Sequence, residues 1–221
     1  MNTLKIKKSL KNIGLLYNGN ARLKAWSVKK SYNDTIRHYA KKNLRGSFAS
    51  LLNERAGDRI KRLKNLDRPL NIFFLGTDEQ QDRSGIIQAL ERLGNLTYFT
   101  GADGSYGQNQ PGSPAERRTN NTKRFLKLFN QLSLQGETPD LLIAQTRASF
   151  IDPKVLSQIR ETYGTLVVNI AMDDRHQYWG EKIQGEWGGT YGLIPHIGLA
   201  LTAAPECVDW YLKEGCPAVF F

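Results

Sequence analysis

The sequence predicts an α/β fold: a Rossmann-like, doubly wound parallel sheet with a basic helical extension at its amino terminus. Beyond residue 70, short apolar runs alternate with amphipathic helical patterns, as in parallel sheets whose strands are joined by crossover helices. The run at 165–171 (TLVVNIA) is apolar and β-branched, as expected for a strand buried on both faces. Polar residues follow at 173–176 (DDRH), where a parallel strand delivers them to the carboxyl edge, at which open α/β sheets bind ligands.

Strands and helices are expected to alternate along the chain. The expected strands span residues 70–75, 96–100, 140–146, 165–171, 199–203 and 217–221. The expected helices cover 84–94, 115–135, 152–163 and 205–215, with Gly94 and Gly164 as stop signals. The loop at 101–116 is either functional or disordered, and Tyr106 is its candidate functional side chain. The Gly- and Trp-rich connection at 179–198 is expected to wrap the carboxyl edge of the sheet.

The positive charge of the protein is concentrated near its amino terminus. Residues 1–70 contain 18 of the 31 Lys and Arg residues and 4 of the 21 acidic residues, so the net charge is +14 there and −4 in the remainder. Apolar residues at helical spacing predict an amphipathic helix interrupted near Gly46 and Gly57. We therefore expect a basic helical extension at 1–67 and an α/β domain at 68–221.

This basic extension allows two interpretations. It binds an anionic surface, or it presents a solvated helical face while it packs against the main domain. Nucleic acid is the least favoured partner, because the extension lacks the interleaved aromatic and basic residues that are typical of single-strand binders.

The composition is that of a globular protein, with 40% hydrophobic and 24% charged residues. No apolar run approaches the roughly 20 residues that cross a bilayer, and the start of the chain lacks the apolar stretch of a secretory signal. These features predict a cytoplasmic protein without a transmembrane segment. Cys207 and Cys216, with three histidines, form neither a disulfide framework nor a four-ligand zinc pattern, so we expect packing cysteines and no metal.

The polar residues after the fourth expected strand are candidate catalytic groups. Asp173 and Asp174 suit general-base chemistry or metal binding, and His176 suits proton transfer at neutral pH. Because adjacent strand residues point to opposite faces, one aspartate at most points into a given pocket. The alternative interpretation makes the aspartates cap or turn residues paired with Arg175, and His176 a solvated loop residue.

Further candidates follow other strands at the same edge. Gly76, Thr77 and Asp78 come after the first strand, and we keep them as candidate substrate-binding residues. Nucleotide binding there is disfavoured, because the loop lacks G-x-G-x-x-G and G-x-x-x-x-G-K-[ST] and its carboxylates would repel a pyrophosphate. Glu206, after the fifth strand, either contacts substrate or is a favourable charge at a helix amino terminus.

The stretch VVNIAMDDRH, followed by GGTYGLIPHIGLALTAAPECVDWYLKEGCPAVFF, resembles the amino-terminal domain of glycosyltransferases related to the spore maturation protein CgeB. The resemblance covers residues 68–221 and keeps the order M-D-D, G-T-Y-G, L-T-A, V-D-W-Y and E-G-C-P. It implies a GT-B enzyme, whose amino-terminal domain binds the acceptor and whose carboxyl-terminal domain binds the nucleotide sugar. Since the family continues into that second domain beyond the region matched here, the donor site is expected outside this chain.

The resemblance also implies roles for individual residues. The base that removes the proton of the acceptor hydroxyl would be one of Asp173, Asp174 and His176. The residues that would position the sugar acceptor are Arg175, Thr190 and Tyr191. The nucleotide sugar would be a co-substrate, and no cofactor or metal would be needed, because a helix dipole and basic groups of the second domain stabilise the leaving diphosphate. The alternative is a non-catalytic module of the same fold that binds a glycan or a protein at this edge.

Overall fold

The computed structural model describes residues 25–221. It contains two compact units, Met1–Lys42 and Asn43–Phe221. The described part of the first unit is a helix over residues 25–40. The second unit, which we call the α/β unit, contains the sheet and its flanking helices. Among residues 25–221, no helix combines the length and the apolar character that crossing a bilayer requires.

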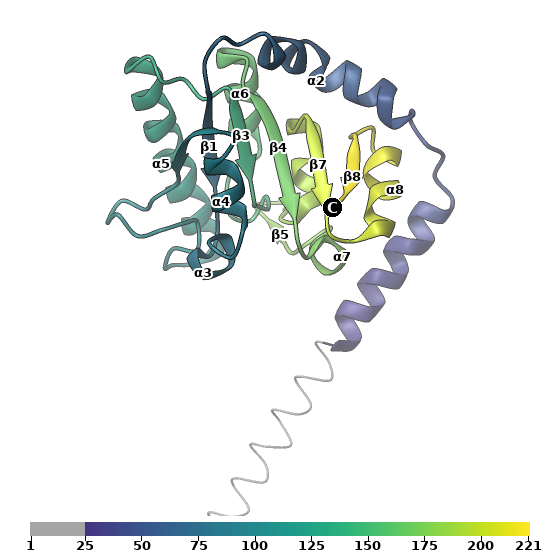
Figure 1. Cartoon of the computed structure of the whole chain (residues 1–221). Coiled ribbons are helices and arrows are strands. Elements are labelled where there is room, and N and C mark those ends of the chain that lie inside the picture. The colour runs from purple at the N-terminus through teal and green to yellow at the C-terminus, as the bar shows by residue number, and fades with distance from the viewer. Residues whose placement is uncertain (1–24) are drawn as a thin grey trace, which may run out of the picture. The chain divides into compact units, whose positions relative to one another are not determined.

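The α/β unit is built on a six-stranded sheet in which every neighbouring pair of strands is parallel (Figure 1). The strands are β1 (Leu70–Leu75), β2 (Gly94–Tyr98), β3 (Leu141–Ala144), β4 (Leu166–Ala171), β7 (Leu199–Thr202) and β8 (Ala218–Phe220). All six predicted strands are present, although β2 lies two residues earlier in the chain than expected. The prediction of an α/β fold with a Rossmann-like parallel sheet is confirmed.

The order of the strands is β2-β1-β3-β4-β7-β8. From β1 the chain moves outward to β2 and then returns past β1 to β3, so the direction of winding reverses between β1 and β3. At such a switch point the loops that follow the two strands diverge and leave a crevice at the carboxyl edge. A single strand lies outside β1, whereas the dinucleotide-binding Rossmann order, 3-2-1-4-5-6, has two.

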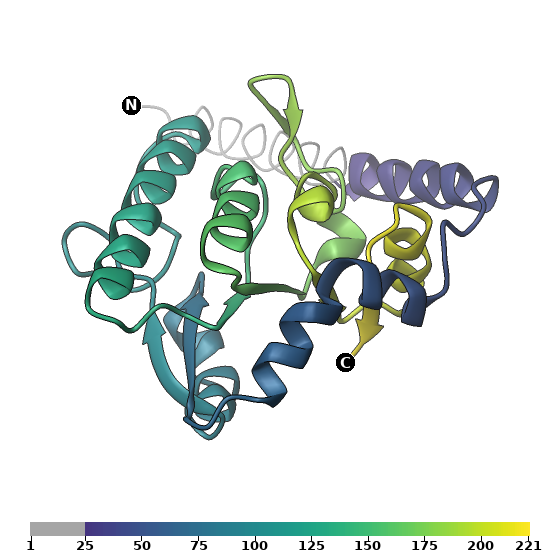
Figure 2. The ribbon, with the colours of Figure 1, turned by 90° about the horizontal axis from the view of Figure 1, so that it is seen from above.

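Helices cover both faces of the sheet (Figure 2). On one face lie α2 (Phe48–Lys64) and α4 (Ile86–Glu91), and on the other lie α5 (Pro114–Leu134), α6 (Lys154–Tyr163) and α8 (Pro205–Lys213). The core of the first face includes Ala56, Ile72, Phe74, Ile87, Ile143 and Val168. On the second face the Phe73 ring packs against Phe125 and Phe129 of α5, with ring centroids 5.4 and 5.9 Å apart.

Helix α2 belongs to the α/β unit, which begins at Asn43, whereas we predicted a boundary after residue 67. The Nη1 of Arg55 donates to the carbonyl oxygens of Ile194 and Ile197, at 2.5 and 3.2 Å. Arg62 donates to the Gly164 carbonyl at 3.0 Å. Arg55 and Arg62 of α2 therefore bind backbone carbonyls of the same unit, in line with the interpretation that this helix packs against the main domain.

Of three glycines that were expected to interrupt or end helices, one does so and two do not. The chain is non-helical around Gly46, as predicted, but α2 runs through Gly57, because its packing on the sheet outweighs the roughly 1 kcal/mol that a helical glycine costs. Gly94 is the first residue of β2, and α4 already ends at Glu91. A Cβ at Gly94 would collide with the Leu70 carbonyl, so this glycine permits the close pairing of β1 and β2.

The connection from β4 to β7 consists of short pieces in place of one crossover helix. These are α7 (Asp174–Gln177), a hairpin of β5 (Lys182–Ile183) and β6 (Glu186–Trp187), and the 3₁₀ helix η1 (Thr190–His196). The backbone amides of Ala148 and Ser149 donate to the carbonyls of Gly189 and Gly188, at 3.3 and 2.7 Å. The connection therefore folds over the loop after β3 at the carboxyl edge, as predicted. Its hairpin and 3₁₀ helix were not predicted, since the Gly-rich sequence has no apolar period.

Candidate functional site

A polar pocket of about 350 Å³ lies at the carboxyl edge over the switch point, and we call it the switch-edge pocket. The loops after β1, β3 and β4 all contribute to its walls. Six of its polar lining residues are Thr77, Asp78, Gln145, Thr146, Asp173 and Thr190. The structure thus brings together five residues that the sequence nominated at this edge: Thr77, Asp78, Asp173, Asp174 and Thr190.

The first wall depends on Gly76, which is buried and shapes the loop without lining the pocket. A Cβ at Gly76 would collide with the Asp82 carboxylate and the Tyr106 hydroxyl. The Tyr106 hydroxyl and the Thr77 amide both donate to Asp82 Oδ2, at 2.9 and 3.0 Å. Burial raises the pKa of Asp82, against the effect of these two hydrogen bonds. Asp82 is fully buried, so this carboxylate does not face a ligand in the pocket.

Asp78 remains exposed at the rim of the pocket. It follows the buried end of β1 and caps the short helix α3 (Glu79–Asp82), because its carboxylate accepts a hydrogen bond of 2.9 Å from the Gln81 amide. Asp78 therefore combines a local structural role with a position from which it can contact a ligand.

Gln108, which the sequence did not single out, ties the loops of β1 and β3 together. The Nε2 of its buried side chain donates to the carbonyls of Leu75 and Gly76, at 3.0 and 3.1 Å. Its Oε1 accepts a hydrogen bond of 2.6 Å from the Thr146 hydroxyl. Asn121 of α5 in turn donates to the Gln108 carbonyl at 2.9 Å. A satisfied buried network of this kind fixes loop positions. The loop at 101–116 therefore supports the floor of the pocket.

The two aspartates after β4 have different environments. Asp173 is exposed, whereas Asp174 is 1% exposed, as expected for adjacent residues that point to opposite sides. Burial raises the pKa of Asp174, although the neighbouring Thr202, Cys207 and Tyr211 side chains lower it. Asp173 is therefore the aspartate that meets solvent in the pocket.

A buried polar cluster adjoins the pocket and is formed by Tyr211 together with Asp174 and Thr190, which line the pocket wall. Within the described residues, Asp174 Oδ2, Thr190 Oγ1 and Tyr211 Oη have no hydrogen-bond partner of good geometry. Burial and the Asp174 charge raise the pKa of Tyr211, so its hydroxyl stays protonated. This cluster joins α7, η1 and α8 behind the Asp173 wall and is positioned to orient the segment that carries Asp173.

His176, Arg175 and Glu206 do not line the switch-edge pocket. His176 is exposed on α7 and does not line the pocket, so the structure does not support it as a catalytic group there. Arg175 Nε binds Glu206 Oε1 at 2.6 Å, and the backbone amide of Arg175 donates to Asp174 Oδ1 at 3.1 Å. Glu206 lies in the first turn of α8, which is a favourable place for a negative charge.

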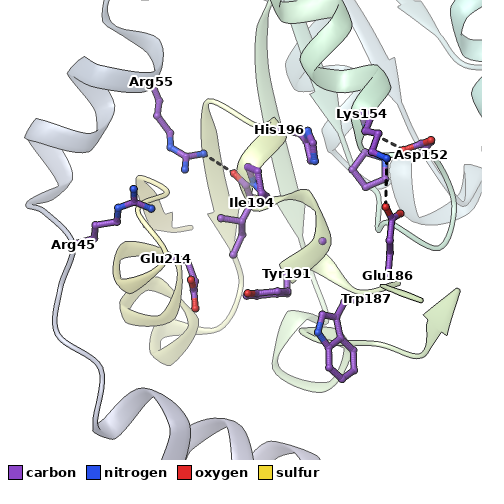
Figure 3. A pocket seen from close by; sticks show the side chains of 13 residues that line it. Arg45, Arg55, Asp152, Lys154, Glu186, Trp187, Tyr191, Ile194, His196 and Glu214 are labelled. Atoms are coloured by element: carbon purple, nitrogen blue, oxygen red, sulfur yellow. Dashed lines mark hydrogen bonds and ion pairs between the residues drawn. The ribbon is translucent and has the colours of Figure 1, made fainter. Parts of the chain in front are cut away.

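The tyrosine after Thr190 lines a separate cavity of about 440 Å³, which we call the aromatic groove (Figure 3). Tyr191 stacks on Trp179 with ring centroids 4.2 Å apart, and Trp187 lies 5.3 Å from the same tryptophan. Figure 3 shows Glu186 between Lys154 and the Trp187 ring, with Arg45 and Arg55 on the opposite side of the groove. Tyr191 is therefore not part of the switch-edge pocket, although the sequence grouped it with Thr190.

The sequence missed two arginines that line the pocket, Arg117 and Arg147. Arg147 directly follows the third strand, so the reasoning that selected residues 173–176 after the fourth strand would have found it. Arg117 lies in the first turn of α5 and has no comparable sequence signal, because only the fold brings that turn to the edge.

The pocket offers amides, hydroxyls, an exposed carboxylate and guanidinium groups, a set that suits a polyhydroxylated, polar ligand and a proton transfer to Asp173. Within residues 25–221, no group of three or more His, Cys, Asp or Glu side chains is arranged to hold a metal ion. Comparisons with protein-family models, with curated proteins and with solved structures find no match for this chain.

Proposed function

We propose that the α/β unit is the acceptor-binding half of a GT-B glycosyltransferase of the CgeB-like type. It would position a hydroxyl of a saccharide acceptor for transfer of a sugar from a nucleotide-sugar donor, which a second Rossmann-like domain would hold. The switch-edge pocket carries this proposal: its amides, hydroxyls and carboxylates come from three strand ends at the edge where such a partner domain would face.

Asp173 is the candidate general base. It is exposed and lines the pocket, whereas Asp174 is buried behind it and His176 lies outside. A base must come within hydrogen-bond reach of the acceptor hydroxyl, and Asp173 meets that condition for a ligand in the pocket. The preceding strand β4 is buried along its whole length, so it provides a rigid support for the carboxylate.

Replacement of the base tests the catalytic part of the proposal. In an enzyme that joins this chain to a donor-binding domain, Asp173→Asn should lower turnover by about 10²–10⁴-fold and leave donor affinity unchanged. Asp58→Asn is a matched control, because the Asp58 side chain is fully exposed on α2. The 221-residue chain alone should release no nucleotide from a nucleotide sugar. Turnover by this chain alone, or full turnover by Asp173→Asn, would contradict the proposal.

The second candidate is a non-catalytic module that binds a saccharide through the same pocket. The burial of Asp174 and the position of His176 outside the pocket favour this second candidate. They leave Asp173 as a single candidate base, whereas a catalytic site often has further acid or base groups. In a module, Asp173→Asn changes saccharide affinity alone. In the enzyme it removes turnover while acceptor binding persists, so paired measurements of affinity and turnover separate the two.

A further inference from the structure

Arg117 and Arg147 form a concentration of positive charge inside the switch-edge pocket. The two guanidinium groups lie over the ring of Phe150, with their central carbons 5.7 and 4.8 Å from its centroid. Both arginines are partly buried. They come from the amino-terminal turn of α5 and from the loop after β3, two segments that the Gln108 network fixes in place.

These arginines have little hydrogen bonding from the protein. Arg117 donates to Asn109 Oδ1 at 3.4 Å and to the Gly112 carbonyl at 3.3 Å, and its buried Nε has no partner among residues 25–221. Within the same residues, no carboxylate lies at salt-bridge distance from either guanidinium, since the ion pairs present involve other residues. Burial and the Arg117 charge lower the pKa of Arg147, and the Asp173 charge opposes this effect.

By contrast, other arginines of the unit have carboxylate partners. Arg118, next to Arg117 in α5, binds Glu186 at 2.6 Å and Asp152 at 3.4 Å, and Arg68 binds Asp140 at 2.7 Å. Two adjacent, half-buried guanidinium groups without carboxylate partners have donors that an anion can satisfy. The protein therefore leaves these donors available at the one edge of the sheet where ligands are expected.

We propose that Arg117 and Arg147 form a subsite for a phosphate group carried by the ligand of the switch-edge pocket. A phosphate monoester carries a charge of about −1.5 to −2 at pH 7, which matches the two guanidinium charges, and its oxygens fit their paired N–H groups. The proposal rests on the proposed function only in taking the rest of the ligand to be a saccharide. On that basis, the acceptor is a phosphorylated saccharide.

The surroundings of the pair limit where the phosphate lies. Arg117, Arg147 and Phe150 line both the switch-edge pocket and a neighbouring cavity of about 500 Å³ under the β5–β6 hairpin. The phosphate would therefore lie at the junction of two cavities, with the pocket residues Thr77 and Thr146 on one side and the hairpin on the other. The same chemistry would fit the diphosphate of a nucleotide donor, so the experiment has to separate these two sources.

The experiment is an NMR titration of the 221-residue chain, with the Nε–Hε signals of its arginines as probes. The ligands are inorganic phosphate, glucose, glucose 6-phosphate and uridine diphosphate. Glucose 6-phosphate should bind about tenfold or more tightly than glucose, move the Arg147 and Arg117 signals, and weaken with salt. Arg147→Met and Arg117→Met should remove this advantage of the phosphate, whereas Arg92→Met, a control on the exposed end of α4, should keep it.

A further variant guards against misfolding. Arg147→Lys keeps the charge but loses the paired donors, so it should retain the fold and show an intermediate affinity for glucose 6-phosphate. If none of the three phosphate-containing ligands moves the Arg147 signal in the folded wild-type chain, the subsite does not exist. Binding of glucose with no contribution from the phosphate would overturn the subsite and leave the proposed function intact. Binding of uridine diphosphate alone would support the subsite but contradict the assignment of the pocket to the acceptor.

Discussion

Tyr106 holds the buried Asp82 carboxylate beneath the switch-edge pocket, and the strength of this contact can be measured. Burial and the Asp82 charge raise the pKa of Tyr106, so its hydroxyl remains a hydrogen-bond donor. Tyr106→Phe leaves a buried carboxylate oxygen with one donor fewer and should lower the free energy of unfolding by about 1–3 kcal/mol. Tyr163→Phe is the matched control, because the Tyr163 hydroxyl donates to Asn130 at an exposed site.

Urea unfolding of the two variants checks this prediction. The control should lose less than about 1 kcal/mol, since water replaces an exposed hydrogen bond at little cost. Equal losses in both variants would mean that the Tyr106–Asp82 contact contributes no more than a surface bond.

Asp174 should make the stability of the protein depend on pH. Its pKa in the folded state is raised above the ordinary value of 3.8, so the folded state binds the proton more tightly than the unfolded chain does. The stabilising contribution is present below the unfolded pKa and is lost as the pH rises through the folded pKa. Asp174→Asn cannot ionise, so its stability relative to wild type should increase over this range by about 1.4 kcal/mol per unit of pKa shift.

Unfolding curves of wild type and Asp174→Asn between pH 4 and pH 8 provide the test. Asp82, whose pKa is also raised, is present in both proteins, so the difference between the curves isolates Asp174. Parallel curves would show that Asp174 keeps an ordinary pKa in the folded state.

At the scale of single residues, the sequence predicted those site residues that directly follow strands. Thr77, Asp78 and Asp173 line the pocket because the carboxyl ends of parallel strands meet at one edge. Gln108 and Arg117 were missed, because a glutamine in an irregular loop and an arginine in a helix acquire their roles only through contacts distant in sequence. The separation of Tyr191 from Thr190 has a similar cause, since the two residues begin the 3₁₀ helix η1 and line different cavities.

Among the elements, helix α2 shows how basic residues support the fold. Arg55 is half-buried and donates to two carbonyls at the end of η1, whereas Lys61 is exposed and pairs with Asp58 across one turn. Arg55→Met should lower the free energy of unfolding by about 1–3 kcal/mol, because it leaves these carbonyls without their charged donor. Lys61→Met should change it by less than about 0.5 kcal/mol.

Thermal or urea unfolding of the two variants distinguishes the roles of the charges. If both substitutions changed the free energy of unfolding by similarly small amounts, the hydrogen bonds from Arg55 to η1 would not stabilise the fold. In that case the basic face of α2 would again be a candidate for binding an anionic surface.

Most elements could be predicted from their periodicity, and the exceptions have physical reasons. The strands are apolar along their length because both faces are covered, and this makes them easy to find. Helix α2 has the apolar period of a helix, but its assignment to the α/β unit depends on contacts with β4 and β7, which follow far along the chain. The β5–β6 hairpin depends on turn geometry, including positive φ at Gln184 and Gly185, and has no apolar pattern.

For the molecule as a whole, the fold class was accessible from the sequence, while the position of the switch point was not. Alternation of strands and helices predicts a parallel sheet, but the order β2-β1-β3 depends on which way the second crossover returns. That order determines that the loops after β1 and β3 open onto the same crevice. It also explains why the arginines of the pocket come from α5 and from the loop after β3.

The position of a bound saccharide on the 221-residue chain tests the proposed acceptor site most directly. Hexoses are titrated into the isotope-labelled chain, and the backbone amide signals are followed by NMR. We expect the largest shifts at Thr77, Gln145, Thr146 and Asp173, around the switch-edge pocket. Shifts that gather instead around Trp187 and Gly192 in the aromatic groove would contradict the assignment of the acceptor to the carboxyl edge of β1 and β3.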